Sequence, residues 1–456
     1  GVVPMRTASR HKLVLGFLAI LPLTGYANEN SLTARQMRED LSALKQQWAP
    51  LDKSFSPDQR QAFERHVSSI ESEVDRLSPE AFAMEIMRSV AIARNGHTNA
   101  NIGAFLGGDL PIRLWWFADG LYVVKAHPYY AHLLGARIEK IGSLTAAEAE
   151  NRLKPYLAGT DQRIHFLSPG YLVTPRVLRH IGAIDDTAKT PLTLNLGSGT
   201  LETVDLPVVA KDPGDERSTG LNRGYAVLVP DAEGTAGRWP HVLDQLKERP
   251  RLYSKRSDVT ASFLDDGKTT LYIRNDTARS VDDKPLVEKF GGIIHKDILP
   301  FQPRHIVVDL RFNNGGDFFN SILFAQALPR LLPDKGRISV LVGRATFSAG
   351  IVTAALIKGS GGERVSLIGE KMGDGGRFWA EGNKITLPNS GISVQYSSEF
   401  EDYEQGCSDV RTCYWATVAF GPRNISLSPE ISVDLSFDDY MRGRDPVLEK
   451  ALEPTR

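Results

Sequence analysis

Between residues 270 and 368 the chain alternates short apolar runs with longer amphipathic ones, and this alternation restricts the folds open to it. The apolar runs at 305–310 and 338–342 contain few polar residues, which is typical of parallel strands buried on both faces. Runs with helical periodicity lie between and after them, at 283–298, 322–331 and 349–357. This order predicts an α/β fold in which helices cover the faces of a sheet.

The remaining chain is long enough for further domains, because 456 residues exceed one ordinary hydrophobic core. Residues 28–110 are expected to form an N-terminal helical domain, since apolar residues recur every three or four positions from Leu41 to Val74. Ser78-Pro79-Glu80 predicts the start of another helix, which should end near Asn95-Gly96. Chain length and the change in periodicity along the chain therefore favour an α/β multidomain protein.

Residues 111–210 read as strands with short helices, an order that resembles a PDZ-like module with an insertion at 156–190. Such a module takes an extended peptide by strand addition, and a structural spacer is the alternative interpretation. Residues 211–262 are rich in Asp, Gly, Arg and Pro and are expected to be a linker or irregular segment. The α/β core then occupies residues 263–456.

The N-terminus has the pattern of a secretory signal. Arg6, Arg10 and Lys12 precede a mostly apolar run at 13–21, and the segment ends in small residues at Ala27. We therefore expect residues 1–27 to be a signal peptide plus upstream residues, and the protein to be exported to the periplasm. An N-terminal membrane anchor is the alternative, although the apolar run is short for a bilayer.

The two cysteines, Cys407 and Cys413, fit an exported chain. A close pair in an oxidising compartment predicts a disulfide, and no histidine lies near them in sequence to suggest a metal site. Net charge is −1, from 54 Lys and Arg against 55 Asp and Glu. That balance gives no electrostatic footprint for nucleic acid, so we expect no nucleic-acid partner. We also expect no metal and no cofactor.

Three segments carry the candidate chemistry. Residues 309–316 read DLRFNNGG at the end of a buried strand, where consecutive glycines free backbone N–H groups. Residues 346–350 read TFSAG between a strand and a helix, which would expose Ser348 beside the N–H group of Ala349. Residues 369–376 read GEKMGDGG after the next strand. Taken singly, the first is typical of a tight turn and the second of a helix N-cap.

Together and in this order, the segments resemble those of the tail-specific (C-terminal-processing) protease family, peptidase family S41. The resemblance covers roughly residues 265–450, including the stretches that begin at Ser428 and Gly443. It implies a core of the ClpP/crotonase-like type preceded by a PDZ-like module. It also implies a serine peptidase that acts on polypeptides without a cofactor, with Ser348 as the nucleophile.

The chain departs from many family members at the catalytic base. Those members carry a lysine in the glycine-rich third segment, as G-K-G. Here that place reads Gly373-Asp374-Gly375, and Lys371 lies earlier, at a variable position. Asn95-Gly96-His97-Thr98 resembles the G-H-T segment of the non-lysine branch, which includes the tricorn-like and retinoid-binding-protein-like cores. The resemblance thus implies His97 as the base.

Backbone N–H groups of Gly315 or Gly316 and of Ala349 would form the oxyanion hole. The acid that would orient His97 is not evident, because the position of that branch's glutamate is Arg423 here. Glu401 and Glu404, just before the cysteine loop, are the candidates, and a two-residue Ser–His site is the alternative. Two other functions stay open: a non-catalytic peptide- or ligand-binding protein on this fold, and an esterase.

Overall fold

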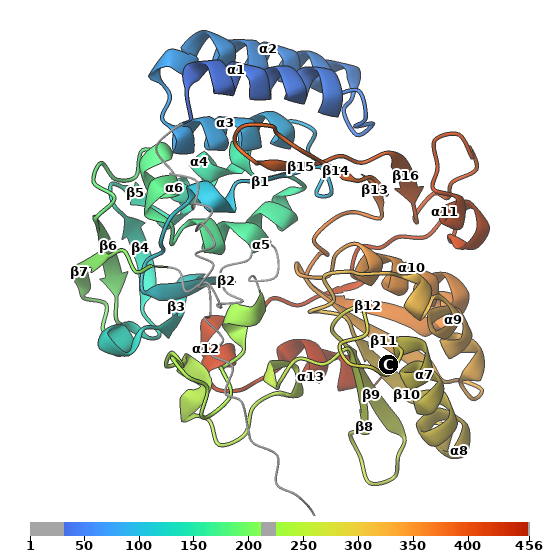
Figure 1. The fold of residues 1–456 in the computed structure, drawn as a ribbon. Coiled ribbons are helices and arrows are strands. Elements are labelled where there is room, and N and C mark those ends of the chain that lie inside the picture. The colour runs from blue at the N-terminus through green and yellow to red at the C-terminus, as the bar shows by residue number, and fades with distance from the viewer. Residues whose placement is uncertain (1–31, 211–224, 455–456) are drawn as a thin grey trace, which may run out of the picture.

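The computed structural model describes residues 32–210 and 225–454, and the expected signal peptide at residues 1–27 lies outside them. Three regions are visible in Figure 1. N-terminal helices form a layer at the top, an antiparallel sheet built from the middle region of the sequence lies at the left, and the α/β core lies at the lower right. Within the described residues, no helix has the length and apolar character needed to cross a membrane. The mixed α/β multidomain character expected from the sequence is therefore present.

The N-terminal layer consists of α1 (Ala34–Ala43), α2 (Pro57–Glu73) and α3 (Pro79–Ala91). Ser78 caps α3 by accepting a hydrogen bond from the Ala81 N–H, and Pro79 occupies the first helical position, as the sequence predicted. Trp48 and Phe63 are fully buried between the helices. After α3 ends, the chain enters the loop that carries His97.

The middle region is a sheet in which every neighbouring pair of strands is antiparallel. The strands run in the order β2 (Ile112–Phe117), β3 (Gly120–Ala126), β4 (Arg137–Ile141), β6 (Lys189–Asn195) and β7 (Leu201–Pro207), and β5 (Leu144–Thr145) pairs with β4. Three helices accompany it: α4 (Ala146–Leu153), α5 (Asp161–Tyr171) and α6 (Pro175–His180). The strand and helix order agrees with the sequence, while a PDZ-like peptide groove stays a prediction.

The segment 225–262 is mostly irregular, as expected, with 3₁₀ turns at Tyr225–Leu228, Val242–Gln245 and Arg251–Tyr253. One difference is that β8 (Val259–Phe263) already begins here and pairs antiparallel with β9 (Thr270–Asn275). The short alternation of residues 259–263 gave too weak a periodic signal to be separated from the linker.

The core sheet has the strand order β17-β12-β11-β10-β9-β8, and every pairing except that of β8 is parallel. Its remaining strands are β10 (His305–Asp309), β11 (Arg337–Val342), β12 (Val365–Gly369) and β17 (Ile431–Ser432). The accompanying helices are α7 (Leu286–Ile293), α8 (Leu299–Phe301), α9 (Phe319–Ala327), α10 (Ala349–Gly361) and α13 (Pro446–Leu452). Helix α12 (Phe437–Met441) packs instead against the antiparallel sheet, where the Phe437 ring stacks on that of Tyr122. Val308 faces the cluster formed with α9 and α10, whereas Val307 faces Val447 of α13. Burial on both faces explains the continuous apolar runs.

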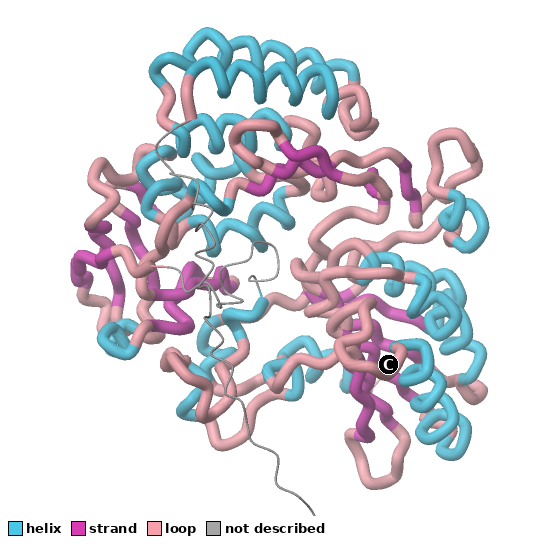
Figure 2. Tube along the Cα trace, viewed as in Figure 1, coloured by secondary structure: helices cyan, strands magenta, loops and turns pink. Residues whose placement is uncertain are grey.

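Two β-arms connect the core to the N-terminal layer. β13 (Arg377–Ala380) pairs with β16 (Glu399–Asp402), and β14 (Lys384–Thr386) pairs with β15 (Ser393–Gln395). β15 also pairs with β1 (Ala100–Asn101), which directly follows the His97 loop. In Figure 2 these strands form the magenta segments between the upper helices and the core. Beyond β16, α11 (Trp415–Phe420) follows the Cys407–Cys413 disulfide, whose prediction is confirmed.

Candidate active site

Ser348 lies between the end of β11 and the first residue of α10, at the predicted strand-to-helix junction. Its backbone has φ 52° and ψ −124°, a conformation that costs a residue with a side chain about 1–3 kcal/mol. The same conformation occurs at nucleophile elbows, because it turns the side chain out of a sharp bend. Ser348 is partly exposed, whereas its neighbours Phe347 and Ala349 are buried.

Thr346 joins the three candidate segments. Its Oγ1 donates to the Leu310 carbonyl over 2.8 Å, and its own carbonyl accepts a hydrogen bond from the Gly373 N–H, also 2.8 Å long. The Phe347 N–H donates to the Asn313 carbonyl over 3.0 Å. The ends of β10, β11 and β12 therefore meet at the nucleophile, as expected where parallel strands end at one edge of a sheet.

The His97 side chain reaches this junction from the N-terminal region. Its Nε2 lies 3.0 Å from Ser348 Oγ, although the two residues are 251 positions apart in sequence. The loop is held next to it by Thr98, whose Oγ1 donates to Asp52 Oδ2 over 2.9 Å. The same Asp52 oxygen accepts the Ser397 N–H over 2.9 Å. The base is thus positioned jointly by the N-terminal layer and a β-arm of the core.

Aromatic rings cover both faces of the His97 imidazole. The Phe347 ring is stacked at a centroid distance of 4.6 Å and the Phe378 ring at 5.2 Å, each tilted by 19°. The Arg163 guanidinium lies over the Phe347 ring, with Cζ 3.7 Å from its centroid. Phe378, His97, Phe347 and Arg163 thus form one stack. The stack restricts rotation of the imidazole, a task that a hydrogen-bonded carboxylate performs in a catalytic triad.

The environment keeps His97 neutral. Burial is the main cause, and the positive charge of Arg163 adds to it, so the pKa of His97 falls from 6.5 to about 3. A neutral imidazole can accept the Ser348 proton at Nε2 when Nδ1 carries the ring proton. Nδ1 is buried and has no hydrogen-bond partner among residues 32–210 and 225–454.

Two of the predicted oxyanion residues, Gly315 and Ala349, adjoin the nucleophile, and Gly316 follows Gly315 in the chain. Gly315 packs directly on Ser348, since a Cβ added to Gly315 would lie 2.8 Å from Ser348 Cβ. Its N–H, however, donates to Asn313 Oδ1 over 3.1 Å. The N–H groups of Gly316 and Ala349 have no partner in the part of the chain that the structure describes. These two groups are the freer donors, and that of Ala349 lies at the positive end of α10.

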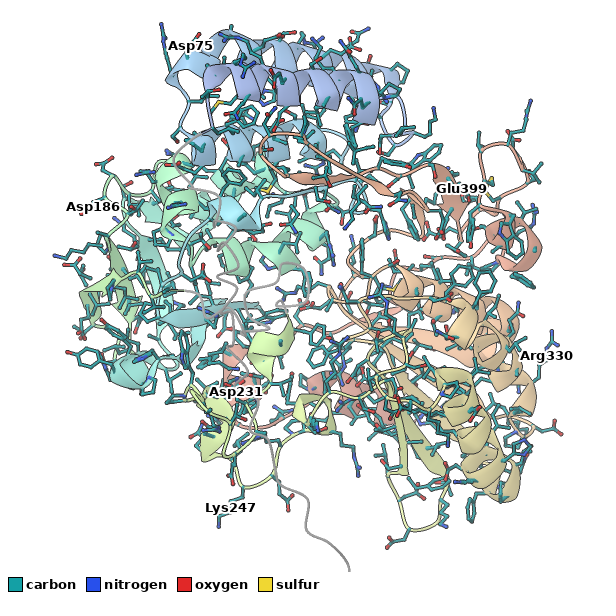
Figure 3. All side chains as sticks on the ribbon, viewed as in Figure 1. Asp75, Asp186, Asp231, Lys247, Arg330 and Glu399 are labelled. Carbon is teal, nitrogen blue, oxygen red and sulfur yellow. A yellow bond between two sulfur atoms is a disulfide. The ribbon has the colours of Figure 1, made fainter. Side chains whose placement is uncertain are left out.

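Neither predicted acid hydrogen-bonds to His97. Glu401 lies on β16, the strand whose first residue, Glu399, is labelled in Figure 3. Its Oε2 accepts the Tyr403 hydroxyl over 2.5 Å, and burial raises its pKa to about 8. Glu404 accepts the Leu427 N–H over 3.0 Å. Both carboxyl groups have partners within their own arm, so the structure corrects the expectation that one of them orients His97.

Several residues near the site were not singled out by sequence reasoning. Arg163 donates from Nη1 to Asn314 Oδ1 over 2.9 Å. It belongs to α5, inside the stretch interpreted as an insertion, and no local pattern indicates that this helix reaches the core. Asp374 had a visible signal, because it replaces a lysine in the family's glycine-rich turn. Lys371 is exposed, consistent with the decision not to assign it as the base.

The metal-free expectation rests on the sequence alone. Within the described residues, no group of three or more His, Cys, Asp or Glu side chains is arranged to hold a metal ion.

Comparison with known proteins identifies the fold. No family model and no curated protein matches the sequence. Among solved structures, mature CPAF matches with a TM-score of 0.58 and 14% identity, over 92% of this chain and 97% of that one. Mature CPAF complexed with lactacystin matches with a TM-score of 0.57 and 13% identity, over 92% and 98%. The chain is therefore similar in fold to mature CPAF along nearly its whole length.

The photosystem II D1 C-terminal processing protease is also among the matches, with a TM-score of 0.38 and 14% identity, over 93% of this chain and 99% of that one. At these levels of identity the likeness describes the fold, and the residues of the site carry the argument about chemistry.

Proposed function

We propose that this chain is a serine peptidase of the tail-specific protease type, which hydrolyses polypeptides with Ser348 as nucleophile and His97 as general base. One observation carries the proposal: a serine in a strained elbow at a helix N-terminus lies 3.0 Å from the ring nitrogen of a neutral histidine. A nucleophile within hydrogen-bond reach of a base, next to free backbone donors, is the arrangement that acyl transfer requires.

Acylation follows from this geometry. His97 Nε2 removes the Ser348 hydroxyl proton while Oγ bonds to the substrate carbonyl carbon, and the carbonyl oxygen becomes an oxyanion. The N–H groups of Gly316 and Ala349 donate to that oxyanion. When the intermediate collapses, the C–N bond breaks and the imidazolium gives its proton to the leaving amine. Water then repeats these steps on the acyl-enzyme, releasing the acid and restoring Ser348.

The proposed location is outside the cytosol. The signal-like residues 1–27 and the Cys407–Cys413 disulfide both support export, because disulfides persist mainly in oxidising compartments. A periplasmic peptidase acting on polypeptide substrates combines these features.

An active-site-directed fluorophosphonate tests the assignment. We expect it to label Ser348 in the folded protein, and an unfolded polypeptide to be cleaved. Ser348→Ala and His97→Ala should each lower kcat by at least about 1,000-fold, whereas Lys371→Ala, at an exposed position, should leave it unchanged.

Three other outcomes would contradict the proposal. Full activity of Ser348→Ala would remove the nucleophile from the mechanism. Absence of labelling in folded protein would favour a non-catalytic binding protein on this fold. Turnover of small esters without peptide cleavage would favour an esterase.

A further inference from the structure

The protonated form of His97 has no evident counter-charge in its immediate contacts. The proposed mechanism forms an imidazolium at this ring, yet Nδ1 is buried without a partner in the described chain. Glu401 and Glu404 are engaged elsewhere. In addition, Arg163 places a second positive charge on the far side of the Phe347 ring. A carboxylate that offsets the charge of Arg163 would make protonation of His97 less costly.

Arg163 itself is a buried cation without an adjacent anion. It is 1% exposed, and within the described residues its side chain donates to the neutral Asn314 amide. Nε is buried without a hydrogen-bond partner, and no described carboxylate lies within ion-pair distance of the guanidinium. A charge in such a position is strongly disfavoured unless an opposite charge lies nearby.

Asp374 is the acid whose charge acts on Arg163. Its Oδ2 would lie 3.6 Å from a Cβ built on Gly96, the residue immediately before His97. Its Oδ1 accepts the Gly375 N–H over 2.8 Å, which fixes the carboxyl group in the turn after β12. The same Cβ on Gly96 would lie 2.9 Å from the Phe347 ring, over which the Arg163 guanidinium lies.

The turn that carries Asp374 is bound directly to α5, the helix of Arg163. Thr160 Oγ1 donates to the Gly373 carbonyl over 3.2 Å, and Gln162 Nε2 donates to the Lys371 carbonyl over 3.0 Å. The two accepting carbonyls belong to residues just before Asp374 in the sequence. The middle region therefore fixes the acid and its cation with respect to each other.

On the basis of the proposed function, we infer that Asp374 is a positioning residue whose negative charge offsets Arg163 and so permits His97 to become protonated during catalysis. In the resting site, Asp374 and Arg163 carry opposite charges and His97 is neutral. In the transition state, the imidazolium and the oxyanion form together, and the total charge remains zero. Without the charge of Asp374, the His97 imidazolium and the Arg163 guanidinium would lie on the two faces of the Phe347 ring with no negative charge to offset them.

The pH dependence has a definite sign. Burial raises the pKa of Asp374 to about 7, against the lowering effects of the Gly375 N–H and Arg163. The carboxylate therefore forms as the pH rises through about 7, where His97 is already neutral because its pKa is about 3. The charged group that acts on Asp374 is Arg163 of α5. The acidic limb of kcat/KM near pH 7 should thus report Asp374.

Asp374→Asn is the direct test on the full-length protein, with kcat and KM for an unfolded polypeptide measured from pH 5 to 9. We expect kcat at pH 8 to fall about 100-fold, as for loss of a unit charge several ångströms away at an effective dielectric of about 20. KM should stay unchanged, and the limb near pH 7 should disappear. Wild-type kcat, or a retained limb, would overturn the inference.

The double variant Arg163→Gln/Asp374→Asn separates charge compensation from a structural role. Glutamine keeps an N–H donor for Asn314 but removes the cation. The kcat of the double variant should therefore exceed that of Asp374→Asn at least about 10-fold, because the two sites are coupled. Failure to recover any activity in a folded double variant would contradict charge compensation.

Further variants keep the test decisive. Asp161→Asn removes an exposed acid of the same helix α5 and should behave as wild type. If Asp374→Asn does not fold, Arg163→Gln alone should move the acidic limb of kcat/KM above pH 7, because Asp374 loses its cation. An unmoved limb would refute the inference.

Loss of activity in Glu404→Gln with full activity in Asp374→Asn would assign the role to Glu404 instead. An inactive wild type that fluorophosphonate does not label would refute the proposed function, not this inference.

Discussion

Asn95 and Trp379 exchange two hydrogen bonds across the boundary between the N-terminal layer and the core. The Trp379 N–H donates to Asn95 Oδ1 over 3.1 Å, and Asn95 Nδ2 donates to the Trp379 carbonyl over 3.0 Å. The Asn95 side chain thereby takes the place of a neighbouring strand along β13. Because His97 follows two residues later, this pair determines where the base meets the nucleophile.

Replacing Asn95 by Ala should lower both activity and stability. The Trp379 N–H and carbonyl would lose their partner in a largely buried position, which typically costs about 1–3 kcal/mol. The His97 loop would also lose its attachment, so we expect kcat to fall at least about 10-fold while fluorophosphonate labelling slows. Thermal unfolding and ester turnover measure the two effects. Asn151→Ala, on the exposed side of α4, is the control and should change neither.

Gly315→Ala should abolish turnover with a limited loss of stability. A Cβ at this position would lie 2.8 Å from Ser348 Cβ, and its φ of +116° disfavours any other residue. Gly197→Ala is a matched control, because φ is +95° there and a Cβ would meet nothing within 4 Å. We expect kcat to fall at least about 100-fold only in Gly315→Ala. Equal activity in both variants would show that contact with Ser348 is unimportant.

Glu401→Gln should stabilise the protein more as the pH rises. Burial raises the pKa of Glu401 to about 8 in the folded state, from an ordinary value of 4.5. The folded protein therefore holds a proton that the unfolded chain releases, and the resulting stability is lost as the pH rises from about 4.5 to 8. Glutamine stays neutral and can still accept the Tyr403 hydroxyl.

We expect the two proteins to have similar free energies of unfolding at pH 4 and the variant to exceed wild type by about 1 kcal/mol or more at pH 8. Denaturant titrations at both pH values measure the difference. Glu64→Gln, at an exposed position on α2, should show no pH-dependent gain. A destabilised Glu401→Gln at pH 8 would refute the assigned direction of the shift.

Replacing both cysteines by serine should lower stability without changing the chemistry. The disulfide joins residues 407 and 413, six positions apart, and closure of so short a loop contributes about 2 kcal/mol in the chain-entropy model. Reductant should lower the unfolding temperature of wild type but not of the double serine variant. Complete loss of kcat in the folded variant would assign the loop a direct part in the site.

Local sequence patterns predict the core well. Apolar continuity marks β10 and β11 because those strands are covered on both faces, and Ser78-Pro79 marks the start of α3 because capping is a local interaction. The approach of His97 to Ser348 could be predicted only through the family resemblance, since no periodicity relates positions 251 apart.

The parts that could not be predicted depend on contacts between distant segments. The aromatic stack on His97 requires Phe347 and Phe378 to converge from different loops, and each reads in sequence as an ordinary core residue. Arg163 lies on a helix whose sequence shows no sign of contact with the core. The sequence suggests an orienting acid just before the cysteine loop, whereas the structure brings Asp374 to the residue before His97.

The attachment of the His97 loop to Trp379 and Ser397 has a consequence for how the chain is made. A ribosome delivers the histidine early and the serine much later, and the β-arm that holds the histidine follows the serine. A partly synthesised chain thus contains both reactive side chains before it can bring them together. Proteolysis would begin only when the fold is nearly complete, which protects the nascent chain and its neighbours from premature cleavage.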